Sequence, residues 1–130
     1  MKIIIAGSRR IKGITLELDR MMLRIRRKGI HIEEVIHGDC RGVDREAGRW
    51  ARLSGIPVRT FPADWKRLGR KAGPVRNTLM VNAGDSLVAF WDSESRGTFD
   101  IIEKARRANM PTEVYIYDHR GDPIQQVGEI

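Results

Sequence analysis

The first ten residues constrain the fold of this chain more than any other segment. The run Lys2-Ile3-Ile4-Ile5-Ala6 is rich in β-branched side chains, and Gly7-Ser8-Arg9 follows it directly. A short apolar run is typical of a strand buried on both faces, and Gly-Ser after it favours a tight turn. In an open α/β sheet, ligands bind beyond the carboxyl ends of the strands, where the strand order reverses. The sequence therefore predicts a central parallel strand that leads into a ligand-binding loop.

Composition limits the class of protein. A length of 130 residues with 41% apolar residues fits one globular domain. No segment has the roughly 20 apolar residues of a membrane span, and the N-terminus lacks the pattern of a signal peptide, so we expect a cytoplasmic protein without a membrane partner. The single cysteine, Cys40, excludes an internal disulfide. The three histidines lack metal-ligand spacing, so we expect neither a metal site nor a bound cofactor.

The net charge of +7, from 24 basic and 17 acidic residues, favours an anionic partner. Nucleotides, nucleic acids and acidic proteins all satisfy this condition. Leu16 and Leu23 are seven residues apart and point away from the apolar face of the first predicted helix. They are interpreted as surface leucines, with a contact in a homo-oligomer as the alternative.

Helical and strand-like segments alternate along the rest of the chain. Helices are expected over Ile14–Gly29, Val43–Ser54 and Val75–Ala83, and between Thr98 and Pro111. Strands are expected over Glu33–His37, Val58–Phe61, Ser86–Trp91 and Glu113–Tyr117.

This pattern predicts one three-layer α/β domain over residues 1–117, with a five-stranded parallel sheet and helices on both faces. Right-handed crossovers that wind outward from the first strand give the strand order 3-2-1-4-5. Residues 118–130 are expected to form a loose tail or an added edge segment. In this order strands 1 and 4 are neighbours at the switch point, so the loops at Gly7 and Gly97 should face one cavity.

Two loops have the residue types of a phosphate site. Gly97-Thr98 stands just ahead of a predicted helix, whose free N–H groups favour a phosphate, although by motif alone a plain N-cap after a flexible glycine is the preferred interpretation. Arg9 follows a buried strand and offers a planar guanidinium to a phosphate, while Ser8 could simply close the turn.

Two further segments are candidates for the same cavity. Gly38 and Gly42 bracket a turn after the second strand, and Asp44 falls in the first turn of the next helix, where an acid is favourable by itself. Arg76 and Asn77 could present a guanidinium and an amide from a helix start, or could be a solvated arginine and a cap. Trp65 and Trp91 could stack on a base or could pack against the protein.

Taken together, these motifs resemble the small YspA-like proteins of the SLOG superfamily. The motifs are Gly7-Ser8-Arg9, the segments His37–Asp44, Phe61–Trp65 and Ala72–Asn77, and Gly97-Thr98. The resemblance implies a Rossmann-like fold in a bacterial or phage protein, and a nucleotide or nucleotide-derived ligand held by Gly7, Ser8, Arg9, Arg76, Asn77, Gly97 and Thr98.

Two branches of this superfamily imply different activities. The "lonely guy" phosphoribohydrolases resemble this chain at Gly97-Thr98, but Ile101 stands where their loop has a glutamate, and an isoleucine cannot transfer a proton. The DNA-processing proteins of natural transformation are similar at Gly7-Ser8-Arg9, at the Gly38–Asp44 turn and at Arg76-Asn77, which implies binding of single-stranded DNA.

Three functions therefore remain open. The first is binding of a nucleotide or an ADP-ribose-like ligand, as a sensor or a sequestering module. The second is hydrolysis of the N-glycosidic bond of a nucleoside monophosphate, with Asp44, Asp92 or Asp100 as the required carboxylate. The third is binding of single-stranded nucleic acid, which the acid-free segment Lys66–Arg76 favours.

Overall fold

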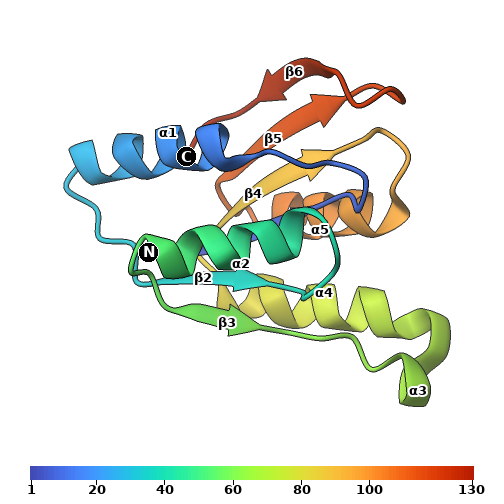
Figure 1. Cartoon of the computed structure of the whole chain (residues 1–130). Coiled ribbons are helices and arrows are strands. Elements are labelled where there is room, and N and C mark those ends of the chain that lie inside the picture. Colours follow the sequence, from blue (N-terminus) through green and yellow to red (C-terminus); the bar gives the residue numbers. More distant parts are fainter.

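A single twisted sheet forms the centre of the molecule, with helices on both faces (Figure 1). The structure is a computed structural model that describes residues 1–130. Its elements, in chain order, are β1 (Lys2–Gly7), α1 (Thr15–Arg27), β2 (Glu34–His37), α2 (Val43–Leu53), β3 (Val58–Thr60), α3 (Trp65–Leu68), the short 3₁₀ helix η1 (Gly69–Lys71), α4 (Ala72–Ala83), β4 (Ser86–Trp91), α5 (Arg96–Arg107), β5 (Thr112–Tyr117) and β6 (Pro123–Val127).

The strand order is β3-β2-β1-β4-β5-β6, which confirms the predicted order of the five parallel strands. Strand β1 lies between β2 and β4, and Ile4 is paired with Ile36 on one side and Leu87 on the other. The last strand, β6, adds an antiparallel edge beside β5. The carboxyl ends of β1 and β4 are therefore adjacent at the point where the winding direction reverses.

The alternation of residues along β1 explains the three layers. Ile3 and Ile5 belong to the core under α1 and α2, together with Leu18 and Val43. Ile4 and Ala6 belong to the core on the opposite face, under α4 and α5. All three isoleucines are completely buried, so the opening apolar run supplies both layers of the core at once.

Two helix starts differ from the prediction. The helix expected from Val75 starts at Ala72 and is preceded by α3 and η1, so the cationic segment is largely helical. Gly97 and Thr98, expected ahead of a helix, lie inside the first turn of α5. The cap of α5 is Ser95, whose side chain accepts a hydrogen bond from the backbone N–H of Thr98 (3.3 Å). Serine is a strong N-cap residue, which places the helix start three residues earlier.

The C-terminal segment returns to the domain after β6. Ile130 is buried, and its backbone N–H donates to Glu113 on β5. Glu113 is completely buried and is paired with Arg24 of α1. These contacts hold residues 128–130 against α1, far from the carboxyl ends of β1 and β4. None of the helices combines the length and the apolar character required to cross a lipid bilayer.

Candidate functional site

A hollow of about 760 Å³ lies at the carboxyl ends of β1 and β4. Its volume falls in the range typical of small-molecule sites. Four parts of the chain form its walls: the loop after β1, the turn before α2, the segment from α3 through α4, and the beginning of α5. This cavity is called the hollow below, and its lining residues are Ala6, Gly7, Arg9, Arg10, Cys40, Asp44, Trp65, Arg70, Gly73, Pro74, Arg76, Asn77, Met80, Asp92, Ser95, Arg96, Gly97, Thr98, Asp100 and Ile101.

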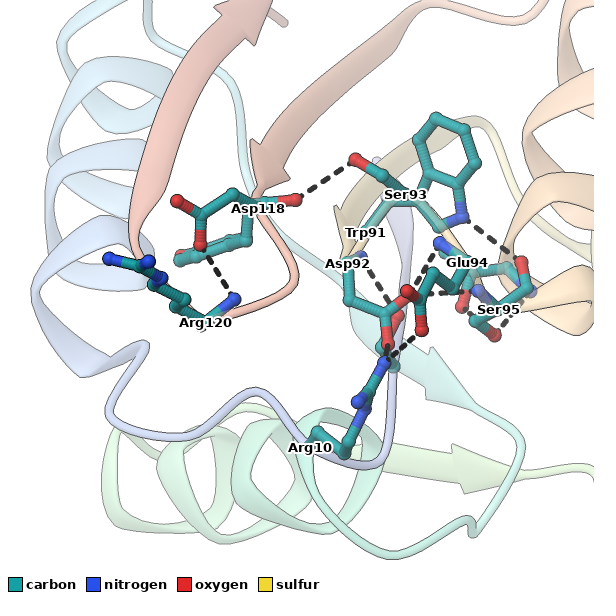
Figure 2. Close-up of polar contacts among 11 residues, drawn as sticks. Arg10, Trp91, Asp92, Ser93, Glu94, Ser95, Asp118 and Arg120 are labelled. Atoms are coloured by element: carbon teal, nitrogen blue, oxygen red, sulfur yellow. Dashed lines mark hydrogen bonds and ion pairs between the residues drawn. The ribbon is translucent and has the colours of Figure 1, made fainter.

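The loops after β1 and β4 are hydrogen-bonded to each other. Ser8 N–H donates to the carbonyl of Phe90 (2.9 Å), and Asp92 N–H donates to Ser8 Oγ (3.1 Å). Arg10 pairs with the carboxylates of Asp92 (3.2 Å) and Glu94 (2.6 Å), as Figure 2 shows. Because a buried serine joins the two loops, the position of Gly7 is fixed relative to the start of α5.

Asp92 organises the loop before α5. Its Oδ1 accepts from the backbone N–H groups of Glu94 (3.0 Å) and Ser95 (2.8 Å) (Figure 2). Burial by itself would raise the pKa of Asp92, but these donors and Arg10 outweigh burial and lower the pKa below its ordinary value. Asp92 is therefore ionised at neutral pH and committed to these partners, which makes it a poor proton donor.

The first turn of α5 presents backbone N–H groups to the hollow. The N–H groups of Ser95 and Thr98 are hydrogen-bonded, whereas those of Arg96 and Gly97 have no partner. Gly97 has an ordinary helical backbone, and a Cβ added there would meet no atom within 4 Å. Packing within the protein therefore does not require a glycine at position 97. The absence of a side chain there leaves the helix start uncovered on the side of the hollow. Such N–H groups favour an anion.

The turn between β2 and α2 forms part of the opposite wall. Asp44 Oδ2 accepts from the backbone N–H groups of Gly38 (3.0 Å) and Cys40 (3.3 Å). Gly42 has φ of +83°, and a side chain there would collide with the backbone of Arg9. The absence of side chains at Gly38 and Gly42 therefore allows this turn to lie close to the residues that surround it.

The pKa of Asp44 is raised to about 6, mainly because the carboxyl group is buried. The Cys40 N–H, the guanidinium of Arg76 and the Gly38 N–H favour the charged form and offset part of this shift. Asp44 thus lines the hollow with a pKa that is shifted toward neutrality, and such groups are frequent at functional sites.

Arg76 and Asn77 hold the walls together, and the prediction that they project from a helix start is wrong. Both lie inside α4 and are buried. Arg76 Nη1 donates to the carbonyl of Gly38 (2.7 Å), and its Nε donates to Asn77 Oδ1 (2.9 Å). Asn77 Nδ2 in turn donates to the carbonyl of Gly97 (3.1 Å) and to Asp100 (2.9 Å). The two side chains thus connect the β2–α2 turn to the start of α5.

The structure brings most of the predicted residues to one cavity. The hollow is lined by Gly7, Arg9, Asp44, Arg76, Asn77, Gly97 and Thr98. Ser8, Gly38 and Gly42 lie behind its surface, where they support the loops. Trp65 lines the hollow and is half exposed, whereas Trp91 lies outside it and donates to the carbonyl of Ser95 (3.0 Å).

Three arginines of the hollow were missed by sequence reasoning: Arg10, Arg70 and Arg96. Arg10 is paired with acids of the β4–α5 loop. Arg70 and Arg96, like Arg9, are exposed and form no ion pair or side-chain hydrogen bond. The positions of two of them in the sequence could have indicated their role: Arg96 directly precedes Gly97, and Arg70 lies in the acid-free segment Lys66–Arg76.

A Rossmann-like sheet, with a hollow lined by several charged residues at its switch point, defines the class of this protein. The chain belongs to the YspA, cpYpsA-related SLOG family, whose model matches residues 1–68. It is 37% identical over 116 residues to the Gene 61 protein of Mycobacterium phage D29, an alignment that covers 85% of this chain and 92% of the phage protein. No solved structure matches the chain.

The family match covers part of the hollow. Residues 1–68 include the loop after β1, the turn with Gly38, Gly42 and Asp44, and Trp65. Arg76, Asn77 and the start of α5 lie beyond the matched residues. Their place in the hollow rests on the structure of this chain.

Proposed function

We propose that this protein binds a nucleotide or a nucleotide-derived, ADP-ribose-like ligand in the hollow, as a sensor or a sequestering module. The observation that carries the proposal is the unpartnered N–H pair of Arg96 and Gly97 in a hollow that the unpaired arginines Arg9 and Arg96 also line. Backbone N–H groups at a helix start and arginine forks are the groups that proteins use to hold phosphate. SLOG family membership supports a nucleotide-related role.

Trp65 gives the hollow a surface for a nucleobase. Its side chain is 52% exposed although it lines the cavity, and a Cβ added at Gly73 would lie 3.3 Å from its ring. Stacking of a base on a tryptophan of this kind contributes about 1–3 kcal/mol. A ligand with a base at Trp65 and phosphate at the start of α5 would use the whole cavity.

Isothermal titration of the purified protein with nucleotides tests the proposal. We expect saturable one-site binding that Gly97→Asp abolishes, because the new carboxylate would occupy the uncovered space beside the N–H pair and repel phosphate. Arg67→Ala is the matched control, since Arg67 pairs with Asp64 and does not line the hollow. Absence of binding across nucleoside mono-, di- and triphosphates and ADP-ribose would refute the proposal.

A second candidate is hydrolysis of a nucleotide N-glycosidic bond, and the raised pKa of Asp44 favours it. A carboxyl group with a pKa of about 6 is suited to general acid–base work near neutral pH. The two other candidate carboxylates have fixed partners: Asp92 pairs with Arg10, and Asp100 pairs with Lys104 (2.8 Å).

Release of free base from nucleoside monophosphates, followed by chromatography, tests this candidate. Hydrolysis by the wild-type protein that Asp44→Asn abolishes would support it, provided that the variant retains nucleotide binding. No release of base from any of the four common nucleoside monophosphates would refute it and leave the binding proposal unchanged.

A further inference from the structure

Three unpaired arginines reach the hollow from three separate parts of the chain. Arg9 follows β1, Arg70 belongs to η1, and Arg96 is the first residue of α5. None of them forms an ion pair or a side-chain hydrogen bond with the protein.

The carboxylates of the hollow do not neutralise these arginines. Asp92 is paired with Arg10, and Asp100 is paired with Lys104 and accepts from Asn77. Asp44 is buried, accepts backbone N–H groups and lies near Arg76. Each acid thus has partners of its own, and the cavity keeps an excess of positive charge.

The free cations come from different walls of the hollow. Arg9 and Arg96 come from the loops that Ser8 and Asp92 join, beside β1 and β4. Arg70 belongs to η1, so it lies on the wall that the segment from α3 through α4 forms, and not on the walls formed by the loop after β1 and the start of α5. A single phosphate held at the start of α5 would engage the first pair and leave Arg70 without a partner.

Unbalanced like charges around a concave surface repel each other and focus a positive potential into it. The ligand that relieves this repulsion best is an anion extended enough to reach more than one wall. A chain of linked phosphates has this property, because each added group carries negative charge and oxygen acceptors one step further along the molecule.

We propose that the ligand of the hollow carries at least two linked phosphate groups, and that Arg70 determines specificity for the phosphate beyond the first. This inference rests on the proposed function and narrows its ligand to nucleoside di- or triphosphates and to molecules with a diphosphate bridge. The first phosphate lies at the N–H groups of Arg96 and Gly97, within reach of Arg9, and the next extends toward Arg70.

Titration with a phosphate series tests the number of phosphates. The probes are AMP, ADP and ATP, with inorganic phosphate, pyrophosphate and tripolyphosphate as base-free counterparts, at constant ionic strength and without divalent metal. We expect affinity to rise about tenfold from one phosphate to two in both series, because one further charge-assisted hydrogen bond is formed. Equal affinity for AMP and ADP would overturn the inference.

The outcome separates this inference from the proposed function. Binding of nucleotides with no dependence on phosphate number would leave the proposed function standing and refute the polyphosphate ligand. Binding of pyrophosphate without binding of any nucleotide would support the polyphosphate site and refute a nucleotide ligand.

Arg70→Ala tests the role of this one side chain. We expect an approximately tenfold loss of affinity for ADP, with affinity for AMP unchanged within twofold. Arg67→Ala, in the preceding helix α3, is the control and should change neither value, since Arg67 does not line the hollow. Equal losses for AMP and ADP in Arg70→Ala, or equal losses in the control, would overturn the assignment. Because Arg70 is exposed and unpaired, the variant should fold normally.

Discussion

Two groups of residues form the hollow, and they differ in whether their polar groups have hydrogen-bond or ion-pair partners within the protein. The base of the hollow comprises Asp44, Arg76 and Asn77 with Gly38 behind them, and their polar groups are hydrogen-bonded to one another or to nearby backbone. The rim comprises Arg9, Arg70, Arg96 and Gly97, whose cations and helix-start N–H groups have no protein partner. The base therefore has the character of a folded core, and the rim has the character of a binding surface.

Because of this difference, the base residues should stabilise the fold and the rim residues should contact a ligand. A buried guanidinium with protein acceptors contributes to stability, and its loss leaves carbonyl groups unsatisfied. An exposed, unpaired guanidinium contributes little to stability, so its free energy of interaction is available to a ligand. Substitutions in the base should mainly change folding, and substitutions in the rim should mainly change binding.

The largest effect is expected from Arg76→Ala. The substitution removes the donor to the carbonyl of Gly38 and to Asn77 Oδ1, both in a buried region, so we expect the free energy of unfolding to fall by about 3 kcal/mol. Urea denaturation measures this change. Arg96→Ala is the matched rim variant and should stay within about 0.5 kcal/mol of the wild type. Equal stabilities for the two variants would contradict the division into base and rim.

The next effect concerns pH and Asp44. Its pKa is about 6 in the folded protein and 3.8 ordinarily, so between these values the folded state binds more protons than the unfolded state. The contribution of this group to stability is therefore present below about pH 4 and is lost as the pH rises through 6. Its size is about 2–3 kcal/mol.

Denaturation of the wild type and of Asp44→Asn at pH 4 and pH 7 measures the pH-dependent contribution of Asp44 to the free energy of unfolding. The difference in unfolding free energy between the two proteins should shift by about 2–3 kcal/mol in favour of the variant from pH 4 to pH 7. A constant difference would mean that Asp44 titrates at its ordinary pKa.

A pair of glycine variants gives a smaller effect and a direct contrast. A Cβ at Gly38 would collide with the guanidinium of Arg76, so Gly38→Ala should destabilise the protein by about 1–3 kcal/mol. A Cβ at Gly97 meets nothing, so Gly97→Ala should leave stability unchanged or raise it by up to about 1 kcal/mol. Thermal unfolding measures both variants, and a destabilised Gly97→Ala would place Gly97 in the base.

The smallest effect in free energy is expected from Arg9→Ala. Loss of one phosphate contact should weaken nucleotide binding about tenfold, which corresponds to about 1.4 kcal/mol, and leave the melting temperature unchanged. Arg41→Ala, an exposed arginine outside the hollow, is the control for net charge. Equal weakening by both variants would indicate a general charge effect in place of a contact at the rim.

The sequence predicted the sheet because its signals are local. The apolar run at Ile3–Ile5 and the turn residues after each strand determine strand positions, and crossover handedness then determines their order. The meeting of Gly7 and Gly97 at one hollow followed from that order. The antiparallel position of β6 was left open, because its exposed residues lack a clear alternation and its pairing depends on the turn after Tyr117.

The direction of a side chain could not be predicted in the same way. Arg76 and Arg96 are the same residue type in two helices that pack against each other, yet one is buried against Gly38 and the other is exposed at the rim. The difference depends on where α4 packs against the β2–α2 turn, which is a tertiary contact. Ser95 and Thr98 are likewise both good cap residues, and only the backbone decides between them.

The central claim is that phosphate binds at the start of α5 between the ends of β1 and β4. A titration with ADP, followed through the backbone amide resonances of the ¹⁵N-labelled protein, tests it most directly. We predict that the amides of Arg96 and Gly97 shift most, with a saturating response. Saturating shifts confined to α1 and the C-terminal segment, with the start of α5 unchanged, would contradict the account.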